Sequence, residues 1–138
     1  MYLFDTNIFL EYLLDQAQAD ACGILIDSIH TNKSAWITSF SLHAIEAIVG
    51  SKPKNKKLLL DFLTHLQSHP YFKIYTTTLE EEIEIIQLCP KIGLDFDDAL
   101  QYFVAKKKGF SLITLDKDFS IIKDIEVIHP LNFSKQIR

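Results

Sequence analysis

The sequence predicts an α/β fold in three layers, α/β/α, with a central parallel sheet. Short runs rich in β-branched and aromatic residues alternate with longer segments of helical periodicity, and this order is typical of parallel strands joined by helices. Hydrophobic residues make up 48% of the 138 positions, which suffices for a core. Glycine is scarce and no linker or repeat interrupts the chain. We therefore expect one domain over residues 1–138.

The first half of the chain alternates between the two element types. "YLFD" is an apolar strand, and "NIFLEYLL" has the length of a short helix. The next helix carries apolar residues at helical spacing, and "SAWITS" alternates as a strand does. The predicted elements are a strand over 2–5, helices over 7–14 and 18–30, a strand over 34–39, and a helix over 41–49 that stops before a glycine.

The second half continues the alternation. One helix ends before a proline, the next carries acids in its first turn, and the last ends in three lysines, as the helix dipole favours. The predicted elements are a helix over 55–69, a strand over 72–78, helices over 79–89 and 95–108, and strands over 110–115 and 125–130.

The charge of the chain limits how it can bind nucleic acid. The formal net charge is −4, which argues against binding by bulk electrostatics alone. A local basic patch remains compatible with this charge. "KPKNKK" supplies four lysines that either form a solvated loop or contact a substrate backbone: Lys52, Lys54, Lys56 and Lys57.

Several features favour a cytoplasmic protein without membrane association. No apolar run approaches the roughly 20 residues of a membrane helix. The N-terminus lacks a basic region, and Asp5 and Glu11 interrupt its apolar stretch. Cys22 and Cys89 lie far apart, fit no metal-ligand spacing and are expected to be reduced.

Acidic residues follow two of the predicted strands. Asp5 stands at the exit of the first strand, and Asp116 at the exit of "FSLITL", with Asp118 shortly after it. Ligand sites in parallel sheets gather beyond the carboxyl ends of the strands. Each acid also has a simpler explanation, since Asp5 can cap the following helix and the other two can be loop acids.

Two further acids lie beside apolar helix stripes. Glu46 stands on the edge of the stripe of "SLHAIEAIV", where a solvated glutamate is unusual. Asp98 flanks the apolar face of its helix within the first turn. Asp95 and Asp97 are neighbours in the same turn that suit an N-cap and a first-turn acid, and either is an alternative to Asp98 at a site.

Together these acids indicate a metal site. Four carboxylates that converge on one sheet edge repel one another unless cations lie between them. Oxygen ligands without thiolates or paired histidines suit Mg²⁺ or Mn²⁺. Such sites promote attack on phosphate esters, so the predicted chemistry is phosphodiester hydrolysis.

At these residues the chain resembles the PIN-domain ribonucleases. The motifs are "LFDTNIFL", "SFSLHAIEAIV" and "LDFDDALQYFVAKKKGFSLITLDKDF", in this order over nearly the whole chain. The resemblance implies metal-binding catalytic acids at Asp5, Glu46, Asp98 and Asp116, an additional acid at Asp118, and orienting polar residues at Thr6, Asn7 and Thr114.

Many members of this size look like VapC-type toxins of toxin–antitoxin pairs. The resemblance therefore implies a Mg²⁺- or Mn²⁺-dependent endoribonuclease that forms a homodimer and is silenced by a cognate antitoxin. Two alternatives remain open. One is a PIN-like nuclease that processes RNA or DNA outside such pairs, and the other is a non-catalytic module whose acids hold a structural cation.

Overall fold

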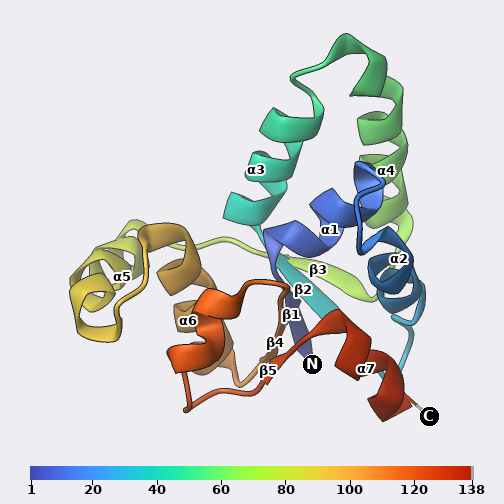
Figure 1. Cartoon of the computed structure of the whole chain (residues 1–138). Helices are drawn as coiled ribbons and strands as arrows, with labels where there is room; N and C mark the ends of the chain where they lie inside the picture. Colours follow the sequence, from blue (N-terminus) through green and yellow to red (C-terminus); the bar gives the residue numbers. More distant parts are fainter. Residues whose placement is uncertain (138) are drawn as a thin grey trace.

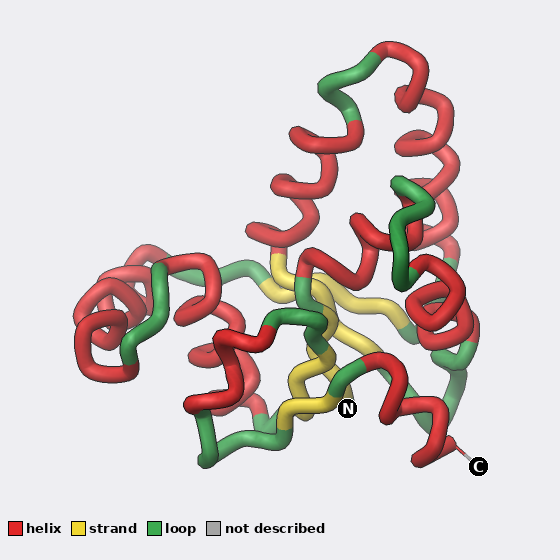
Figure 2. The backbone as a smooth tube through the Cα atoms, in the orientation of Figure 1, coloured by secondary structure: helices red, strands yellow, loops and turns green. Residues whose placement is uncertain are grey.

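A computed structural model describes residues 1–137. Its centre is a five-stranded sheet with the order β3-β2-β1-β4-β5, in which every pair of neighbours is parallel. The strands lie in the middle of the molecule with helices on either side (Figures 1 and 2). The strands are β1 (Tyr2–Phe4), β2 (Ala35–Thr38), β3 (Phe72–Tyr75), β4 (Ser111–Ile113) and β5 (Val127–Ile128).

The connections between the strands are helical. The helices are α1 (Thr6–Leu13), α2 (Ala19–Asp27), α3 (Ser39–Val49), α4 (Lys56–Ser68), α5 (Leu79–Ile92), α6 (Phe96–Lys108) and α7 (Pro130–Ile137), with short 3₁₀ turns η1 (Pro53–Asn55) and η2 (Lys117–Ile121).

Alternate residues of the strands pack into two separate hydrophobic cores. In β1, Leu3 joins the core formed with α5, α6 and η2, whereas Phe4 joins the core formed with α1, α2, α3, α4 and α7. In β4, Leu112 and Ile113 divide in the same way. A parallel sheet buried on both faces requires this double apolar pattern. The predicted three-layer α/β/α architecture is confirmed.

The central strands bring distant acids to one edge. Phe4 pairs with Ile113, and the amide of Asp5 donates a hydrogen bond of 3.0 Å to the Ile113 carbonyl. Because β1 and β4 are parallel, the segments that follow both strands leave from the same edge of the sheet. Helix α3 starts at this edge too, directly after β2.

The main differences from the sequence prediction concern β3, α5 and α7. The strand predicted over 72–78 ends at Tyr75, because Thr78 is the N-cap of α5. Helix α5 continues through Pro90 to Ile92 and ends at Gly93, which is a left-handed C-cap. Helix α7 was not predicted; it begins at Pro130, which suits the first position of a helix.

Within residues 1–137, no helix is long and apolar enough to span a bilayer.

Candidate active site

Asp5 is buried at the end of β1 and is 5% exposed. Its Oδ1 accepts a hydrogen bond of 2.8 Å from the Thr6 amide, and its Oδ2 accepts one of 2.6 Å from the Thr114 hydroxyl. Burial raises the pKa of Asp5, the hydrogen bonds from Thr114 and Thr6 oppose this rise, and the charges of Asp116 and Asp97 add to it. Asp5 is thus both the N-cap of α1 and a carboxylate held toward other acids.

Asp98, Asp116 and Asp118 form a cluster beside Asp5. One carboxylate oxygen from each of the three lies within 4.8 Å of the others. Asp116 follows β4 and accepts a hydrogen bond of 2.9 Å from the Asp118 amide, while its own amide donates to Thr114 Oγ1 at 2.9 Å. Thr114 therefore links Asp5 to the turn that carries the other two acids.

The surroundings of Asp98 disfavour its negative charge. Partial burial and repulsion from four neighbouring aspartates raise its pKa to about 7, the neighbours being Asp97, Asp116, Asp5 and Asp118. Within residues 1–137, no lysine or arginine lines the cleft around these acids. The cluster is thus a concentration of negative charge without an internal cation.

The first turn of α6 presents two of its three acids to this cleft. Asp97 and Asp98 line it, whereas Asp95 is exposed at the N-cap and does not. Only Asp98 belongs to the three-carboxylate cluster. The structure therefore favours Asp98 over both alternatives.

A buried polar hub that the sequence analysis missed stands behind the acids. The Ser41 hydroxyl lies 2.8 Å from Thr6 Oγ1, 3.1 Å from Thr38 Oγ1 and 2.5 Å from Gln101 Nε2. Gln101 is 1% exposed, and its Oε1 has no hydrogen-bond partner among the residues that the structure describes. The hub connects α1, α3 and α6 and so supports the positions of the acids on them. The only sequence signal was a glutamine beside the apolar stripe of α6.

The cleft has a volume of about 240 Å³ and a mixed lining. Its acids come from the end of β1, the first turn of α6 and the segment after β4, whereas α3 contributes only the apolar side chains of Phe40, Ala44 and Ile48. A larger hollow of about 380 Å³ lies between α5 and α6. None of the aspartates lines it, so its size does not make it the better candidate.

Glu46 does not line the cleft. Successive helical residues are rotated by about 100°, so Glu46 points nearly opposite to Ala44 and Ile48, which do line it. Glu46 is half-buried, as its place beside the apolar stripe suggested. The expected convergence of all four acids is thus observed for Asp5, Asp98 and Asp116 but not for Glu46.

The four lysines also lie away from the cleft. Lys52 precedes η1, Lys54 lies within it, and Lys56 and Lys57 begin α4. This turn is at the far end of α3 from the sheet (Figure 1). All four side chains are exposed, and Lys57 pairs with Asp61 at 3.1 Å.

The donor set fits a hard divalent cation. The cluster offers only carboxylate oxygens, which Mg²⁺ and Mn²⁺ prefer. Positive charge at this point would remove the repulsion that raises the pKa of Asp98. Asp98, Asp116 and Asp118 are the residues placed to hold such an ion, with Asp5 adjacent.

The family model for the PIN domain matches residues 2–125. A comparison with curated proteins finds no significant match.

Three solved structures share the fold at low sequence identity. A toxin–antitoxin complex from Klebsiella pneumoniae is 22% identical, with a TM-score of 0.69 over 94% of this chain and 98% of that chain. VapBC2 from Rickettsia felis, bound to a promoter DNA fragment, is 17% identical, with a TM-score of 0.72 over 93% and 97%. VapC20 from Mycobacterium tuberculosis, described as a toxin that cleaves the sarcin–ricin loop, is 15% identical, with a TM-score of 0.74 over 91% and 99%.

The family match covers most of the chain and includes Asp5, Asp98, Asp116 and Asp118. The sequence resemblance is thereby confirmed: the chain belongs to the PIN domain family, a family of nucleases.

Proposed function

We propose that the protein is a divalent-metal-dependent endoribonuclease and the toxin of a toxin–antitoxin pair. The observation that carries this proposal is the carboxylate cluster at the sheet edge. Its three acids lie within 4.8 Å of one another, and repulsion contributes to the raised pKa of Asp98. Carboxylates that repel one another in this way are expected where a cation binds between them.

The residues have separate tasks in this proposal. Asp98, Asp116 and Asp118, with Asp5, would hold Mg²⁺ or Mn²⁺. A bound ion of this kind polarises a phosphate ester and stabilises the departing oxygen. Thr114 and the Thr6 amide fix the orientation of the Asp5 carboxylate through their hydrogen bonds.

Other residues support the site less directly. Asn7 is exposed and lines the cleft together with the acids, where it would orient a water or substrate oxygen. No histidine lines the cleft in the described part of the chain, so the carboxylates act mainly as ligands rather than beside an imidazole base. Glu46 is implied as a ligand by the family resemblance alone, and its position outside the cleft argues against that role.

The lysines of residues 52–57 would contact RNA outside the cleft. Their distance from the acids limits them to the backbone of a longer substrate. Such contacts would give salt-dependent affinity without sequence recognition.

The toxin role, a cognate antitoxin, a homodimer and a cytoplasmic location belong to the same proposal. They are supported by solved relatives that are toxins or toxin–antitoxin complexes. A PIN nuclease acting outside such pairs is the main alternative. A neighbouring antitoxin gene, and co-purification of its product with this chain, would discriminate between the two.

The test is cleavage of a single-stranded RNA with Mg²⁺ or Mn²⁺. We expect cleavage that EDTA abolishes and that Asp5→Asn lowers by at least about a hundredfold. Asp95→Asn is the matched control, because it makes the same change at an exposed acid outside the cleft. Wild-type protein that binds metal but never cleaves would favour the structural-cation alternative.

A further inference from the structure

The α3 side of the cleft is an apolar wall, formed by Phe40, Ala44 and Ile48. The three residues follow one another at intervals of four, so they lie along one face of the helix. Phe40 is 38% exposed and Ile48 is 48% exposed. An exposed helix face is normally polar, so an apolar face beside a charged cluster indicates a binding surface.

Phe40 is the aromatic member of this wall. It stands in the first turn of α3, where this helix leaves the sheet edge that carries the acids. Its ring meets the Phe96 ring in a T-shaped contact, with centroids 6.2 Å apart and an interplanar angle of 78°. Phe96 begins α6, two residues before Asp98, so this contact ties the aromatic ring to the helix that supplies the acids.

The two sides of the cleft define the chemistry of its occupant. The carboxylate side, once it holds a cation, attracts an anion such as a phosphate. The apolar side accepts a flat, weakly polar surface. A nucleotide with an unpaired base carries both groups next to each other, whereas a duplex hides its base faces in the stack.

On this basis we propose that Phe40 stacks on an unpaired nucleobase next to the phosphate held at the acids. The proposal rests on the nuclease function given above and adds a residue that contacts the base of the substrate. Stacking of this kind tolerates any base, because every base has a π-face.

The test measures binding rather than cleavage. A fluorescein-labelled single-stranded RNA of nine nucleotides is titrated with protein in Ca²⁺, and its anisotropy is followed. We expect Phe40→Leu to weaken binding about tenfold and Phe40→Tyr to change it less than about twofold. Tyr12→Leu is the matched control, since Tyr12 is 46% exposed on α1 outside this cleft. Thermal unfolding of each variant confirms that it is folded.

A second arm identifies the base that stacks. One nucleoside at a time is replaced by an abasic unit. In wild type, the abasic unit at one position should weaken RNA binding about tenfold. In Phe40→Leu, the same replacement should weaken binding no further. Duplex RNA should bind both proteins equally.

Three results would overturn the proposal. The first is equal affinity of wild type and Phe40→Leu for single-stranded RNA, and the second is no RNA binding by wild type. The third is that each abasic replacement weakens RNA binding by Phe40→Leu as much as it weakens binding by wild type. A dimer in size-exclusion chromatography that Phe40→Leu alone dissociates, with RNA affinity unchanged, would assign the wall to a second copy of the chain. RNA binding that depends on Phe40 without any cleavage would leave this inference standing and reject the nuclease function.

Discussion

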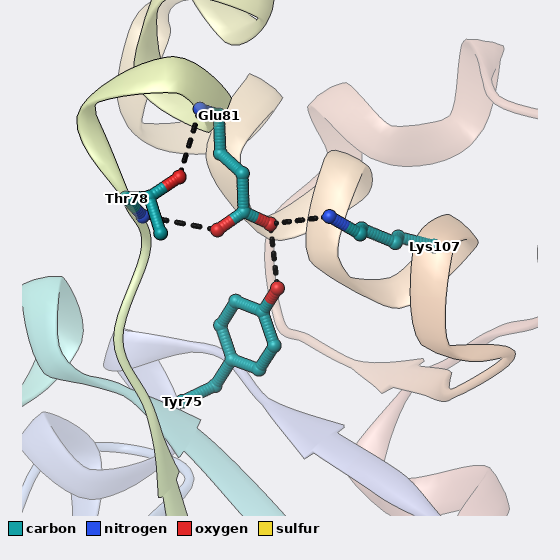
Figure 3. A network of polar contacts seen from close by, with 4 residues as sticks. All are labelled: Tyr75, Thr78, Glu81 and Lys107. Carbon is teal, nitrogen blue, oxygen red and sulfur yellow. Dashed lines mark hydrogen bonds and ion pairs between the residues drawn. The ribbon is translucent and has the colours of Figure 1, made fainter.

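Glu81 and Asp98 occupy the same position in two neighbouring helices and meet opposite surroundings. Each is the third residue of its helix, α5 or α6, where the helix dipole favours an acid. Glu81 accepts hydrogen bonds from Tyr75 at 2.6 Å, the Thr78 amide at 3.0 Å and Lys107 at 2.9 Å (Figure 3). Asp98 instead faces four other aspartates.

The two carboxyl groups respond in opposite directions. Burial alone would raise the pKa of Glu81, but the hydrogen bonds from Tyr75, Thr78 and Lys107 outweigh it and lower the pKa to about 2. Burial and like charges raise that of Asp98 to about 7. The chain thus supplies hydrogen-bond and ion-pair partners for Glu81, whereas no lysine or arginine of residues 1–137 lines the cleft around Asp98.

The largest effect should be on metal binding. Asp98→Asn should abolish the rise in thermal midpoint that Mn²⁺ gives wild type, because it removes one carboxylate of the cluster. At a hundred times its dissociation constant, an ion stabilises by about 2.7 kcal/mol. Calorimetric titration and thermal unfolding measure the affinity and the stabilisation.

Two variants serve as controls for this metal effect. Glu81→Gln should keep the full shift, since Glu81 lies in a different network. Glu46→Gln should keep the Mn²⁺ affinity within about threefold, a margin below 1 kcal/mol. A loss with Glu46→Gln as large as with Asp98→Asn would make Glu46 a ligand.

Glu81→Gln should destabilise the protein by about 2 kcal/mol at pH 7, the range of hydrogen bonds to a charged group. The variant removes the charge of the capping-box acid and leaves Lys107 without its ion-pair partner. Chemical denaturation of both proteins measures the difference. Equal stability would show that the network contributes nothing beyond its neutral hydrogen bonds.

This difference should shrink in acid. The folded pKa of Glu81, about 2, lies below its ordinary value of 4.5. Its charge therefore stabilises the fold above about pH 4.5, and this contribution is lost as the pH falls toward 2. Repeating the denaturation of both proteins at pH 3 should give a smaller gap than at pH 7. A stability difference that is larger at pH 3 than at pH 7 would contradict the lowered pKa of Glu81.

The smallest expected effect is a gain in stability rather than a loss. Without metal, Asp98→Asn should stabilise the protein by about 1 kcal/mol at pH 8, because it removes one charge from a repelling cluster. Thermal unfolding in EDTA measures this change. Asp95→Asn, outside the cluster, should not reproduce it. Destabilisation by Asp98→Asn would show that its helix-start role outweighs the repulsion.

The sequence predicted those site residues whose position follows from the order of the strands. Asp5 and Asp116 were recognised because each follows an apolar strand, and parallel strands end at a common edge. The ambiguity between Asp95, Asp97 and Asp98 needed the structure, because three acids in one turn differ only in helix rotation. The same limit applies to Glu46, since a place beside an apolar stripe does not tell which side of that stripe faces the cleft.

Other features depend on packing between distant elements. Ser41 and Gln101 are 60 positions apart, and nothing local marks them as one buried hub. The apolar wall was hidden among ordinary core residues, because Phe40, Ala44 and Ile48 read as part of a buried helix. Of the four lysines of residues 52–57, two lie in the turn before α4 and two begin α4, and the length of α3 separates all four from the acids (Figure 1).

The hydrogen bond between Thr114 and Asp5 also bears on synthesis of the protein. Its two residues are 109 positions apart. Ribosomes deliver Asp5 early and Thr114 late, so this contact can form only after most of the chain has been synthesised. A nascent chain that has not yet released β4 holds Asp5 without its threonine partner and without Asp116. The carboxylate cluster therefore cannot assemble during most of translation, and an unfinished chain lacks the complete site.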